Sequence, residues 1–589
     1  MSIVKDVKIG RHKNLLTIDT PYQLKGLCQA IPDYRKWNKT LKMWVARPSV
    51  PTVVYMTEVF RSAEWSPEAM ELVAEAMVIQ ERAEELRAER KDVGPDPEVV
   101  DYIWEGVPSP FAHQKRGFLL SRDEVAYALL MEQGTGKTKI AIDTVAWWHM
   151  TGKANALFVV APNGVKDVWA EEIEDHLPTT VDREVRVWDS KLGKRALEEL
   201  KVWIKVPSPG LKVFIVNVEG LSTKRAQGWA TEFLTWNRCL MVVDESTRIK
   251  TPGAKRTKAI IKLGKMAKAR RILTGTPVTK NPLDLFTQFG FLDQRILGYT
   301  SFYAFRNRYA VMGGYERREI QSFINLDELK ETISPHSFRV LSEECQDLPP
   351  KVYQRIDVDL TSEQRRIYNE LKTNLLTEYA GQTISVTLAM TLYMRLQQIA
   401  GGFVSVLSDE ALAGNYVPST DKYVSHRIEG GNPKLDALGE FVEGTDEKVI
   451  VWARFRPELE LIADTLREQY GPRSVAEFHG GVDNKTRTAN RRAFQDPASS
   501  VRFFVGNPAT GGLGITLTAA PFAFYFSNSF DLEERLQSEK RPHRHGQTKT
   551  VVFVDAVARD TVEEKIRKTL LSKKSLADMI TGDAWTAWL

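Results

Sequence analysis

Cysteine is scarce in this chain, which has three cysteines among 589 residues. Cys28, Cys239 and Cys345 lie far apart in the sequence, and their spacing matches no metal-binding pattern. Cys239 stands within an apolar run, where we expect a small core side chain. So few cysteines fit a reducing, intracellular setting.

Long hydrophobic runs are missing as well. No stretch of about eighteen apolar residues occurs, so the sequence predicts no membrane-spanning helix. The chain does not begin with the apolar segment of a secretory signal, and we expect no targeting signal. With 43% hydrophobic and 27% charged residues, the composition is that of an ordinary globular protein of about two to four domains.

A strong excess of one charge is also lacking, because 81 Lys and Arg residues face 76 Asp and Glu residues. The distribution is more informative. Residues 1–60 contain ten basic and four acidic residues, and basic and aromatic residues are interleaved in residues 31–44. Cations suit phosphates and flat rings suit exposed bases. The candidate nucleic-acid contacts are Arg35, Lys36, Trp37 and Trp44. The alternative, equally open, is a small α+β domain with both tryptophans in its core and solvated lysines.

The hydrophobic pattern divides the rest of the chain into two α/β segments and smaller parts. Residues 64–92 hold nine acidic and four basic residues with apolar residues at near-helical spacing, which predicts a charged helix. Apolar runs that alternate with helical patterns predict parallel sheets covered on both faces. The predicted domains are a small basic domain at 1–62, a charged helical linker at 63–105, a first α/β lobe at 106–345, a helical insertion at 346–433, a second α/β lobe at 434–560 and a basic helix at 561–589.

Two glycines interrupt an apolar run within LLMEQGTGKT, at residues 129–138, and a helical pattern follows. Strand, glycine loop and helix are the context of a phosphate-binding loop, whose lysine neutralises the phosphate and whose threonine holds Mg²⁺. The residues predicted to bind the nucleotide are Gly134, Thr135, Gly136, Lys137 and Thr138. The strict pattern requires a glycine where Met131 stands, so a glycine turn before a core helix is the alternative.

An acidic pair ends the apolar run at residues 239–245. The carboxylate of Asp244 would bind Mg²⁺ through water, and Glu245 would orient and deprotonate the attacking water. Alone, such a pair is also typical of a helix N-cap. Following a glycine loop that ends in Lys-Thr, it predicts phosphate chemistry.

An unbroken basic segment follows this pair. Residues 248–271 contain ten Lys and Arg residues and no acidic residue. Beside a nucleotide site, uncompensated cations favour contact with a nucleic-acid backbone, and a solvated helix face is the alternative. The candidate contacts are Lys250, Lys255 and Arg256.

A second basic cluster, QSEKRPHRHGQ, lies at residues 537–547. Two arginines three residues apart, Arg541 and Arg544, would present guanidinium groups from one side of a turn. Charge on a γ-phosphate in the transition state requires such groups, and a second domain can supply them. Hydrolysis would then depend on closure of two domains. The alternative is a surface cluster; the two histidines have no further metal ligands near them in the sequence.

These motifs, in this order, resemble those of the superfamily-two helicases, and within them the Swi/Snf-type DNA translocases. The resemblance covers about residues 108–570. It rests on FAHQKRG at 111–117, VVAP at 159–162 with the residues through Trp169 to Ile173, DESTRIK at 244–250, LTGTPV at 273–278 followed by NPLDLF at 281–286, FHGG at 478–481, GGLGITLTAA at 511–520 and the Q-x-x-x-R-x-H-R-x-G-Q spacing at 537–547. Met131 stands where the family usually has aspartate. Ser246 and Thr247 replace the usual alanine and histidine, which puts the family's histidine relay in doubt, though not hydrolysis.

The resemblance implies two tandem RecA-like parallel-sheet lobes that use ATP and Mg²⁺. It assigns adenine recognition to Gln114 and further nucleotide contacts to Gly514 and Gln537. It also assigns the coupling between hydrolysis and DNA to Thr274, Gly275 and Thr276. The amino-terminal segment, with Ile31-Pro32 before its basic and aromatic residues and Lys42-x-Trp44, resembles the HARP-type domain of annealing and fork-remodelling translocases.

We therefore expect a monomeric, DNA-dependent ATPase that moves along duplex, forked or branched DNA largely independently of sequence. Translocation, fork reversal or reannealing is expected rather than processive unwinding. A motor that displaces proteins such as RNA polymerase, a translocating restriction subunit, and a catalytically silent DNA-binding scaffold are the alternatives. Replication, recombination or transcription proteins are possible partners. A prokaryotic or viral protein that acts in the cytoplasm is expected, because no chromatin-reading module follows the motor.

Overall fold

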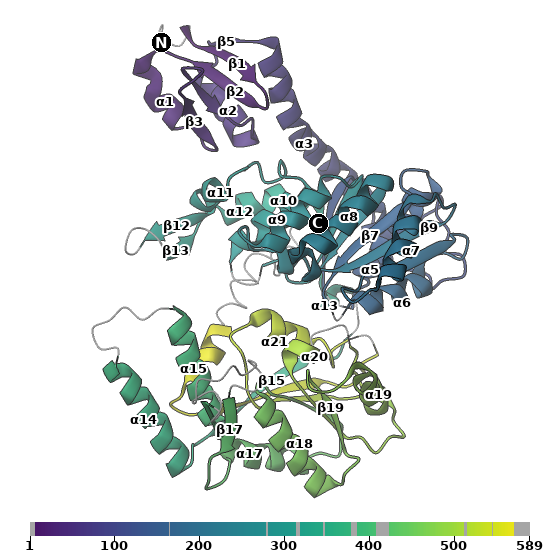
Figure 1. The fold of residues 1–589 in the computed structure, drawn as a ribbon, viewed down its shortest axis with the longest axis vertical. Helices are drawn as coiled ribbons and strands as arrows, with labels where there is room; N and C mark the ends of the chain where they lie inside the picture. The colour runs from purple at the N-terminus through teal and green to yellow at the C-terminus, as the bar shows by residue number, and fades with distance from the viewer. Residues whose placement is uncertain are drawn as a thin grey trace. The chain divides into compact units, whose positions relative to one another are not determined.

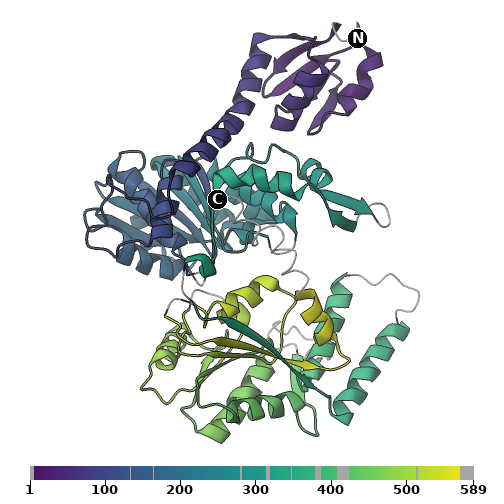
Figure 2. The ribbon, with the colours of Figure 1, turned by 180° about the vertical axis from the view of Figure 1, so that it is seen from behind.

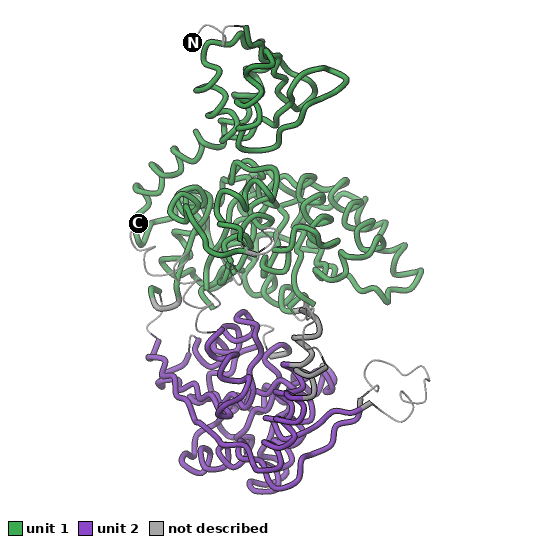
Figure 3. The backbone as a smooth tube through the Cα atoms, turned by 90° about the vertical axis from the view of Figure 1, so that its left-hand side faces the viewer, with its two compact units in different colours: residues 1–345, 576–589 green, residues 346–575 purple. Residues whose placement is uncertain are grey.

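The computed structural model describes residues 6–132, 134–163, 165–278, 281–313, 319–345, 348–378, 386–407, 423–511, 515–544 and 546–570. These residues form two compact units, and the chain passes from one to the other after Cys345 (Figure 3). The predicted fold class is confirmed. Each unit contains a parallel sheet covered by helices, and a small sheet domain precedes the first lobe (Figures 1 and 2).

The amino-terminal domain is a five-stranded sheet in the order β3-β4-β2-β1-β5. Its elements are β1 (Lys8–His12), β2 (Leu15–Asp19), α1 (Lys25–Gln29), β3 (Arg35–Asn38), β4 (Met43–Ala46), α2 (Val50–Val59) and β5 (Glu64–Trp65). Alternate residues such as Ile9, Leu16 and Ile18 are buried in its core, as expected for strands with one covered face. Because β5 pairs with β1, the domain extends past the predicted boundary at residue 62.

The charged segment forms one helix, α3 (Pro67–Asp92), which begins at the N-cap Ser66. Ala69 and Leu72, in its first turns, belong to the core of the amino-terminal domain. Near its end, Arg87 Nη2 donates a hydrogen bond to Glu331 O at 3.0 Å, in the first lobe. The predicted charged helix therefore connects the small domain to the lobe, and both of its ends are packed (Figure 1).

The first lobe has a seven-stranded sheet in the order β14-β6-β11-β10-β7-β9-β8, and every recorded pairing in it is parallel. The strands are β6 (Ala126–Met131), β7 (Ala156–Ala161), β8 (Arg183–Val187), β9 (Leu211–Asn217), β10 (Cys239–Asp244), β11 (Ala269–Leu273) and β14 (Ser337–Val340). The helices are α4 (Ala112–Ser121), α5 (Lys137–Met150), α6 (Lys166–His176), α7 (Lys194–Lys205), α8 (Lys224–Trp236), α9 (Lys255–Gly264), α10 (Leu285–Leu292), α11 (Phe302–Tyr309), α12 (Leu326–Ile333) and α13 (Ser342–Cys345). A hairpin, β12 (Ala310–Gly313) and β13 (Glu319–Phe323), lies between α11 and α12.

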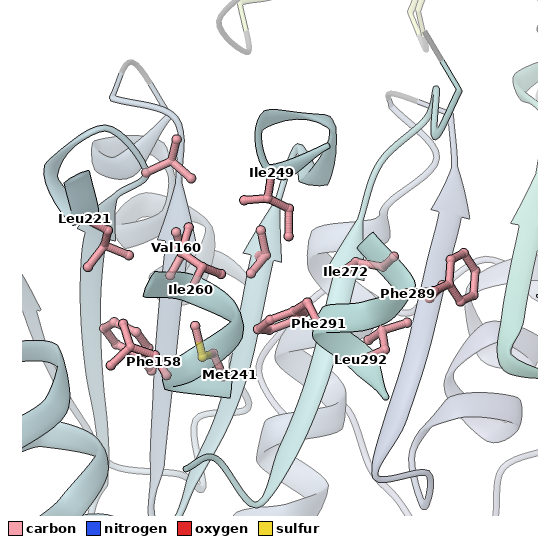
Figure 4. Close-up of a cluster of buried hydrophobic side chains, with 14 of the residues drawn as sticks. Phe158, Val160, Leu221, Met241, Ile249, Ile260, Ile272, Phe289, Phe291 and Leu292 are labelled. Atoms are coloured by element: carbon pink, nitrogen blue, oxygen red, sulfur yellow. The ribbon is translucent and has the colours of Figure 1, made fainter. Parts of the chain in front are cut away.

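Buried side chains cover both faces of this sheet. On one face, Ile260 of α9 and Phe291 of α10 pack with strand residues such as Met241 and Ile272 (Figure 4). On the other face, α5 and α6 contribute Ile142 and Ile173 to a separate cluster. The central strands β6, β7 and β10 are almost entirely apolar, as expected for strands covered by helices on both faces, whereas the edge strand β8 alternates polar and apolar residues.

The second unit has a six-stranded sheet in the order β15-β22-β21-β18-β20-β19, also parallel in every recorded pairing. The strands are β15 (Lys351–Val358), β18 (Val449–Trp452), β19 (Val475–Phe478), β20 (Phe503–Gly506), β21 (Phe522–Tyr525) and β22 (Val551–Ala558). The helices are α14 (Ser362–Glu378), α15 (Val386–Ala400), α17 (Pro433–Glu443), α18 (Arg456–Tyr470), α19 (Asn484–Gln495), α20 (Pro508–Gly511) and α21 (Leu532–Glu539).

The region predicted as a helical insertion, 346–433, is only partly helical. It contributes β15 to the second sheet, in register with β22 along eight residue pairs. It also contains an antiparallel hairpin of β16 (Phe403–Leu407) and β17 (Tyr423–Arg427). Residues 562–570 are helical, and the rest of the predicted carboxyl-terminal helix lies outside the described residues.

Candidate nucleotide-binding site

Three adjacent strands of the first sheet, in the order β6-β11-β10, end at the same edge. The glycine loop follows β6, the Thr274–Thr276 segment follows β11, and Asp244 is the last residue of β10. Asp244 is in register with Leu273, the residue before Thr274. The middle segment therefore lies between the glycine loop and the acidic pair, at the edge where parallel sheets place their ligand sites.

The glycine loop adopts a backbone that requires its glycines. Gly134 and Gly136 have φ values of 88° and 87°, in the left-handed region. A Cβ atom on Gly136 would lie 2.0 Å from Nε2 of Gln114. Met131, by contrast, is still within β6 and pairs with Val340. An extended, buried strand position accepts methionine, so the missing first glycine does not disturb the loop.

Gln114 is buried against this loop, with 7% of its surface exposed. Its Oε1 accepts a hydrogen bond from Phe111 N at 3.0 Å, and its Nε2 donates one to Thr135 O at 3.2 Å. Nε2 of His113 also lies 2.8 Å from Thr135 O. In this structure Gln114 therefore supports the glycine loop, and its amide keeps one N–H donor and one acceptor lone pair beyond these two bonds.

Lys137 is the first residue of α5, and 7% of its surface is exposed. Its amino group makes no hydrogen bond or ion pair with any residue that the structure describes. Its charge lowers the pKa of Asp244, so the two groups are close. The ammonium group is therefore available at the sheet edge to an anion such as a phosphate. The amino-terminus of α5 adds free N–H groups and a positive helix dipole at the same place.

Asp244 has 5% of its surface exposed, and a neighbouring helix orients its carboxylate. Nε1 of Trp169, in α6, donates a hydrogen bond to Oδ2 at 2.9 Å, and Glu245 N donates one to Oδ1 at 2.9 Å. Burial, followed by the charge of Glu245, raises the pKa of Asp244 to about 6. Together with the Thr138 hydroxyl in the first turn of α5, this carboxylate fits Mg²⁺, which would need phosphate oxygens and water as further ligands.

Glu245 has φ 47° and ψ 59°, a left-handed conformation that is unusual for a residue with a side chain. Such a conformation costs roughly 1–2 kcal/mol and is found where the surrounding structure imposes it. The side chain is half-buried and makes no hydrogen bond with any described residue. A carboxylate held in this way is available to a water molecule.

The segment after β11 is ordered by its own hydrogen bonds. Thr274 is fully buried, its amide donates to Leu129 O at 3.2 Å, and its hydroxyl accepts from Thr276 N at 3.2 Å. The predicted coupling residues therefore join the end of β11 to the end of β6. Gly275 and Thr276 are half-buried beside them.

In the second unit, the predicted arginines differ in exposure. Arg541 is fully buried, and its Nη1 donates to Ile515 O at 3.3 Å. Arg544 is half-buried, and its Nη1 donates to Thr516 Oγ1 at 3.2 Å. Gln537, in α21, donates to Glu533 Oε1 at 3.2 Å. Gly514 lies outside the described residues. The two arginines bond to Ile515 and Thr516, the residues that directly follow it in the sequence.

Comparison with protein families finds two matching domains. Residues 113–401 match the model of the SNF2-related domain, and residues 433–546 match the model of the helicase conserved C-terminal domain. The two matches leave out the amino-terminal sheet domain and α3. The SNF2-related domain therefore includes the glycine loop and the acidic pair, and the helicase C-terminal domain includes both arginines.

Similar proteins carry the same type of domain within longer chains. "Chromodomain-helicase-DNA-binding protein 1-like" of Danio rerio is 25% identical over 76% of this chain and 41% of its own length. "DNA annealing helicase and endonuclease ZRANB3" of Bos taurus is 26% identical over 77% of this chain and 38% of its own length. This chain thus spans about two fifths of these two curated relatives. A solved structure, "Sulfolobus solfataricus SWI2/SNF2 ATPase core in complex with dsDNA", matches with 23% identity and a TM-score of 0.36, covering 83% of this chain and 97% of that one.

The basic segment of the SNF2-related domain is less uniform than its composition indicates. Arg271 lies in β11, is fully buried, and donates to Ser121 O and Glu124 O at 2.5 and 2.7 Å, so it is a core residue. Among the predicted contacts, Lys255 is exposed, whereas Lys250 and Arg256 are half-buried, and Arg256 Nε donates to Arg248 O. One face of α9 and its C-cap residue instead present an exposed lysine row, Lys255, Lys258, Lys262 and, at the C-cap, Lys265. Their spacing of three, four and three residues places them on one side of the helix.

The amino-terminal candidates also separate. Arg35, Lys36 and Trp37 are exposed on the edge strand β3, and Trp37 has 43% of its surface exposed. Trp44 is directly opposite Trp37, with ring centroids 5.9 Å apart, and packs against the domain core. Trp44 therefore packs in the domain core, as the alternative interpretation of the sequence expected for both tryptophans. The ring of Trp37 is accessible to a ligand.

No helix in the described part of the chain is long and apolar enough to cross a membrane. The same residues contain no cluster of three or more His, Cys, Asp or Glu side chains suited to a metal ion. Two residues that contact the acidic segment received no role from the sequence: Trp169, which bonds to Asp244, and Gln288, which accepts a hydrogen bond from the hydroxyl group of Ser246. The only signal for Trp169 was its place in a family motif, and Gln288 lies beyond the last one quoted for the first lobe.

The raised pKa of Asp244 leads to a prediction about stability. The pKa of Asp244 is about 4 in the unfolded chain and about 6 in the folded protein. As pH rises from the lower to the higher of these two values, a carboxyl group of this kind makes the folded protein less stable. Asp244→Asn should therefore raise the stability of the ATP-free protein at pH 8 by up to about 3 kcal/mol, because each pKa unit corresponds to about 1.4 kcal/mol. Thermal unfolding in EDTA measures the effect. The gain should shrink towards pH 4.5, and an equal difference at both pH values would contradict the prediction.

Proposed function

We propose that this protein is an ATP-driven motor that moves on duplex or branched DNA. The observation that carries the proposal is Lys137, a buried cation without a partner among the described residues, at the amino-terminus of α5 and close to a buried carboxylate. Nucleotide phosphates with a bound Mg²⁺ satisfy both groups at once, since they bring negative charge to the lysine and a cation to Asp244.

Each residue of the edge then has a distinct role. Backbone N–H groups of the glycine loop and the amino group of Lys137 hold the phosphates. Thr138 and Asp244 hold Mg²⁺, which would neutralise charge on the transferred phosphoryl group. Glu245 accepts the proton of the attacking water, and its half-exposed position leaves room for that water.

The second unit supplies the remaining charge in this proposal. Arg541 and Arg544 would approach the γ-phosphate when the two units close, which couples turnover to their relative movement. The family model matched by residues 433–546 supports this assignment, since both arginines lie within it. Repeated closing and opening on a nucleic-acid backbone would yield translocation.

Sequence-independent contact with DNA is supported by the lysine row on α9. Four exposed cations on one helical face suit a line of phosphates and contain no group that distinguishes bases. At the amino-terminal domain, we propose that Arg35, Lys36 and Trp37 add contacts to unpaired bases at forks or junctions, in the manner of a HARP-like domain. Within this function we propose reannealing of DNA strands as the activity, and the printed name of one relative, a DNA annealing helicase and endonuclease, supports it, while other relatives are chromatin-remodelling ATPases.

ATP turnover with and without DNA tests the proposal. Purified protein should hydrolyse ATP slowly alone and faster with duplex, forked or four-way-junction DNA, and Lys137→Ala should abolish turnover on every substrate. Trp37→Ala should reduce stimulation by forks and junctions more than stimulation by plain duplex. This substitution is preferable to removing residues 1–60, because β5 and α3 complete the amino-terminal core. Absence of hydrolysis on all substrates would leave the silent scaffold as the better account.

The lysine row leads to a second prediction, concerning salt. Replacing Lys255, Lys258, Lys262 and Lys265 by glutamine should weaken binding to duplex DNA. The slope of log affinity against log salt should fall by about 0.9 for each phosphate that the helix no longer neutralises. The matched control replaces four exposed lysines elsewhere in the first lobe, Lys191, Lys194, Lys201 and Lys224. Fluorescence anisotropy across a salt series measures both variants. Equal slopes for the wild type and the α9 variant would show that DNA is bound elsewhere.

A further inference from the structure

A buried hydrogen bond follows the acidic pair directly. The side chain of Ser246 is fully buried, and its hydroxyl group donates to Oε1 of Gln288 at 2.7 Å. Gln288 belongs to α10 and is also fully buried. Glutamine is rarely buried completely unless its polar atoms are hydrogen-bonded, so we expect the amide group of Gln288 to have partners at both ends.

The amide group of Gln288 is paired at its other end with the segment after β11. Its Nε2 donates to Pro277 O at 2.7 Å and to Asp284 O at 2.9 Å. The carbonyl accepts from a hydroxyl group and the two N–H groups donate to two carbonyls, so a flipped amide would lose these bonds. Gln288 thus joins the residue after Glu245 to the residue after Thr276.

The position of Ser246 matters for Glu245 because the backbone of Glu245 is left-handed. Such a conformation persists only where its neighbours are fixed. Residues 246–249 form a short 3₁₀ turn, and the hydroxyl of Thr257, in α9, donates to Ile249 O at 3.2 Å at its far end. The turn is therefore held by α10 on one side and by the lysine-bearing helix α9 on the other.

We infer that Ser246 and Gln288 form a positioning bridge, which sets the direction of the Glu245 carboxylate and keeps it in register with the Thr274–Thr276 segment. This inference rests on the proposed ATP hydrolysis. The related translocases have alanine at the position of Ser246, so the hydroxyl group that makes this bond is a feature of this chain. Neither bridge residue contacts the nucleotide in this account. Both act through Glu245.

Steady-state kinetics of Ser246→Ala, Gln288→Leu and the double variant test the bridge in the full-length protein with duplex DNA. Each single variant should lower kcat by about ten-fold or more, because a small misplacement of a catalytic group has large effects. Binding of a fluorescent ATP analogue should be unchanged, because the glycine loop and Lys137 are untouched. The double variant should be no slower than the single ones, because one bridge is removed in all three.

Ser337→Ala is the matched control, since it removes another buried serine hydroxyl from the first lobe, bonded to Ile333 O at 2.9 Å. It should leave kcat unchanged. Gln288→Met, which fills a similar volume, replaces Gln288→Leu if that variant does not fold. Normal kcat in both single variants, or reductions that multiply in the double variant, would overturn the bridge while leaving the proposed function intact. Absence of hydrolysis by the wild-type protein would overturn both.

Discussion

Glu245→Gln should lower ATP turnover by about 100- to 10,000-fold, the usual contribution of a general base, while ATP binding is retained. The amide has the size of the carboxylate but cannot accept the proton of the attacking water. The side chain of Glu245 also makes no hydrogen bond with any described residue, so its replacement disturbs no internal pairing. Single-turnover hydrolysis and binding of a fluorescent ATP analogue, measured together, separate the chemical step from binding.

Glu219→Gln is the matched control for this prediction. Glu219 lies two residues after the end of β9, at the same edge of the first sheet, and its side chain is exposed. Unlike Glu245, it does not follow a buried aspartate. Its replacement should leave turnover unchanged. If Glu245→Gln instead weakens ATP binding and keeps the rate constant of hydrolysis, Glu245 has a binding role and another group is the base.

Much of the nucleotide site could be predicted because its parts are local patterns. Gly134 and Gly136 mark backbone positions with positive φ, which few other residues adopt. Lys137 follows at the start of a helix, and Asp244 ends an apolar strand, so sequence position alone places both at a sheet edge. The order of two parallel-sheet lobes is predictable for the same reason, since alternating strands and helices leave few other folds.

The contacts that orient these groups are not local and have no pattern of their own. The hydrogen bond from Trp169 to Asp244 joins residues 75 positions apart, and the one from Ser246 to Gln288 spans 42 positions. A hydrogen bond of this kind can be made by many residue types at many positions, so the sequence does not reveal which residues form it. The assignment of residues 346–433 as a helical insertion failed at β15 for the same reason, because this strand pairs with a strand two hundred residues later.

The basic segment shows a different limit of composition. Ten cations in residues 248–271 predict a uniformly charged surface, but Arg270 and Arg271 lie in strand β11. Burial lowers the pKa of Arg271 to about 10, and backbone carbonyls bind its guanidinium group. A charge count does not distinguish such a residue from the exposed lysines of α9. The helical spacing of Lys255, Lys258 and Lys262 identifies these lysines as one face of a helix, because residues three or four positions apart lie on the same side.

In the second unit, substitution of Arg541 or Arg544 should have the largest effect on ATP turnover. Because Arg541 is fully buried and Arg544 is half-buried, the two substitutions should differ in their effect on stability. Arg544→Ala should lower turnover by about 1,000-fold or more, as expected for a residue that stabilises charge on the γ-phosphate, with a smaller loss of thermal stability than Arg541→Ala, because Arg541 is the more deeply buried of the two. Arg544 is half-buried, and the hydrogen bond from its Nη1 to Thr516 Oγ1 is worth little to folding. Arg544→Lys should recover only part of the rate, because an ammonium group keeps the charge but lacks the planar pair of N–H donors with which a guanidinium group binds two phosphate oxygens at once.

Arg541→Ala should lower both turnover and the melting temperature. Arg541 is fully buried and donates to Ile515 O, so its removal opens a cavity beside Leu517, whose amide is bonded to the carbonyl of Arg541. Arg473→Ala, at an exposed position of the same unit, is the control and should change neither quantity. Turnover, ATP binding and thermal unfolding measured on all four variants decide the assignment. Reduced stability with normal turnover in Arg541→Ala would make Arg541 a structural residue and leave Arg544 as the single arginine that reaches the phosphate.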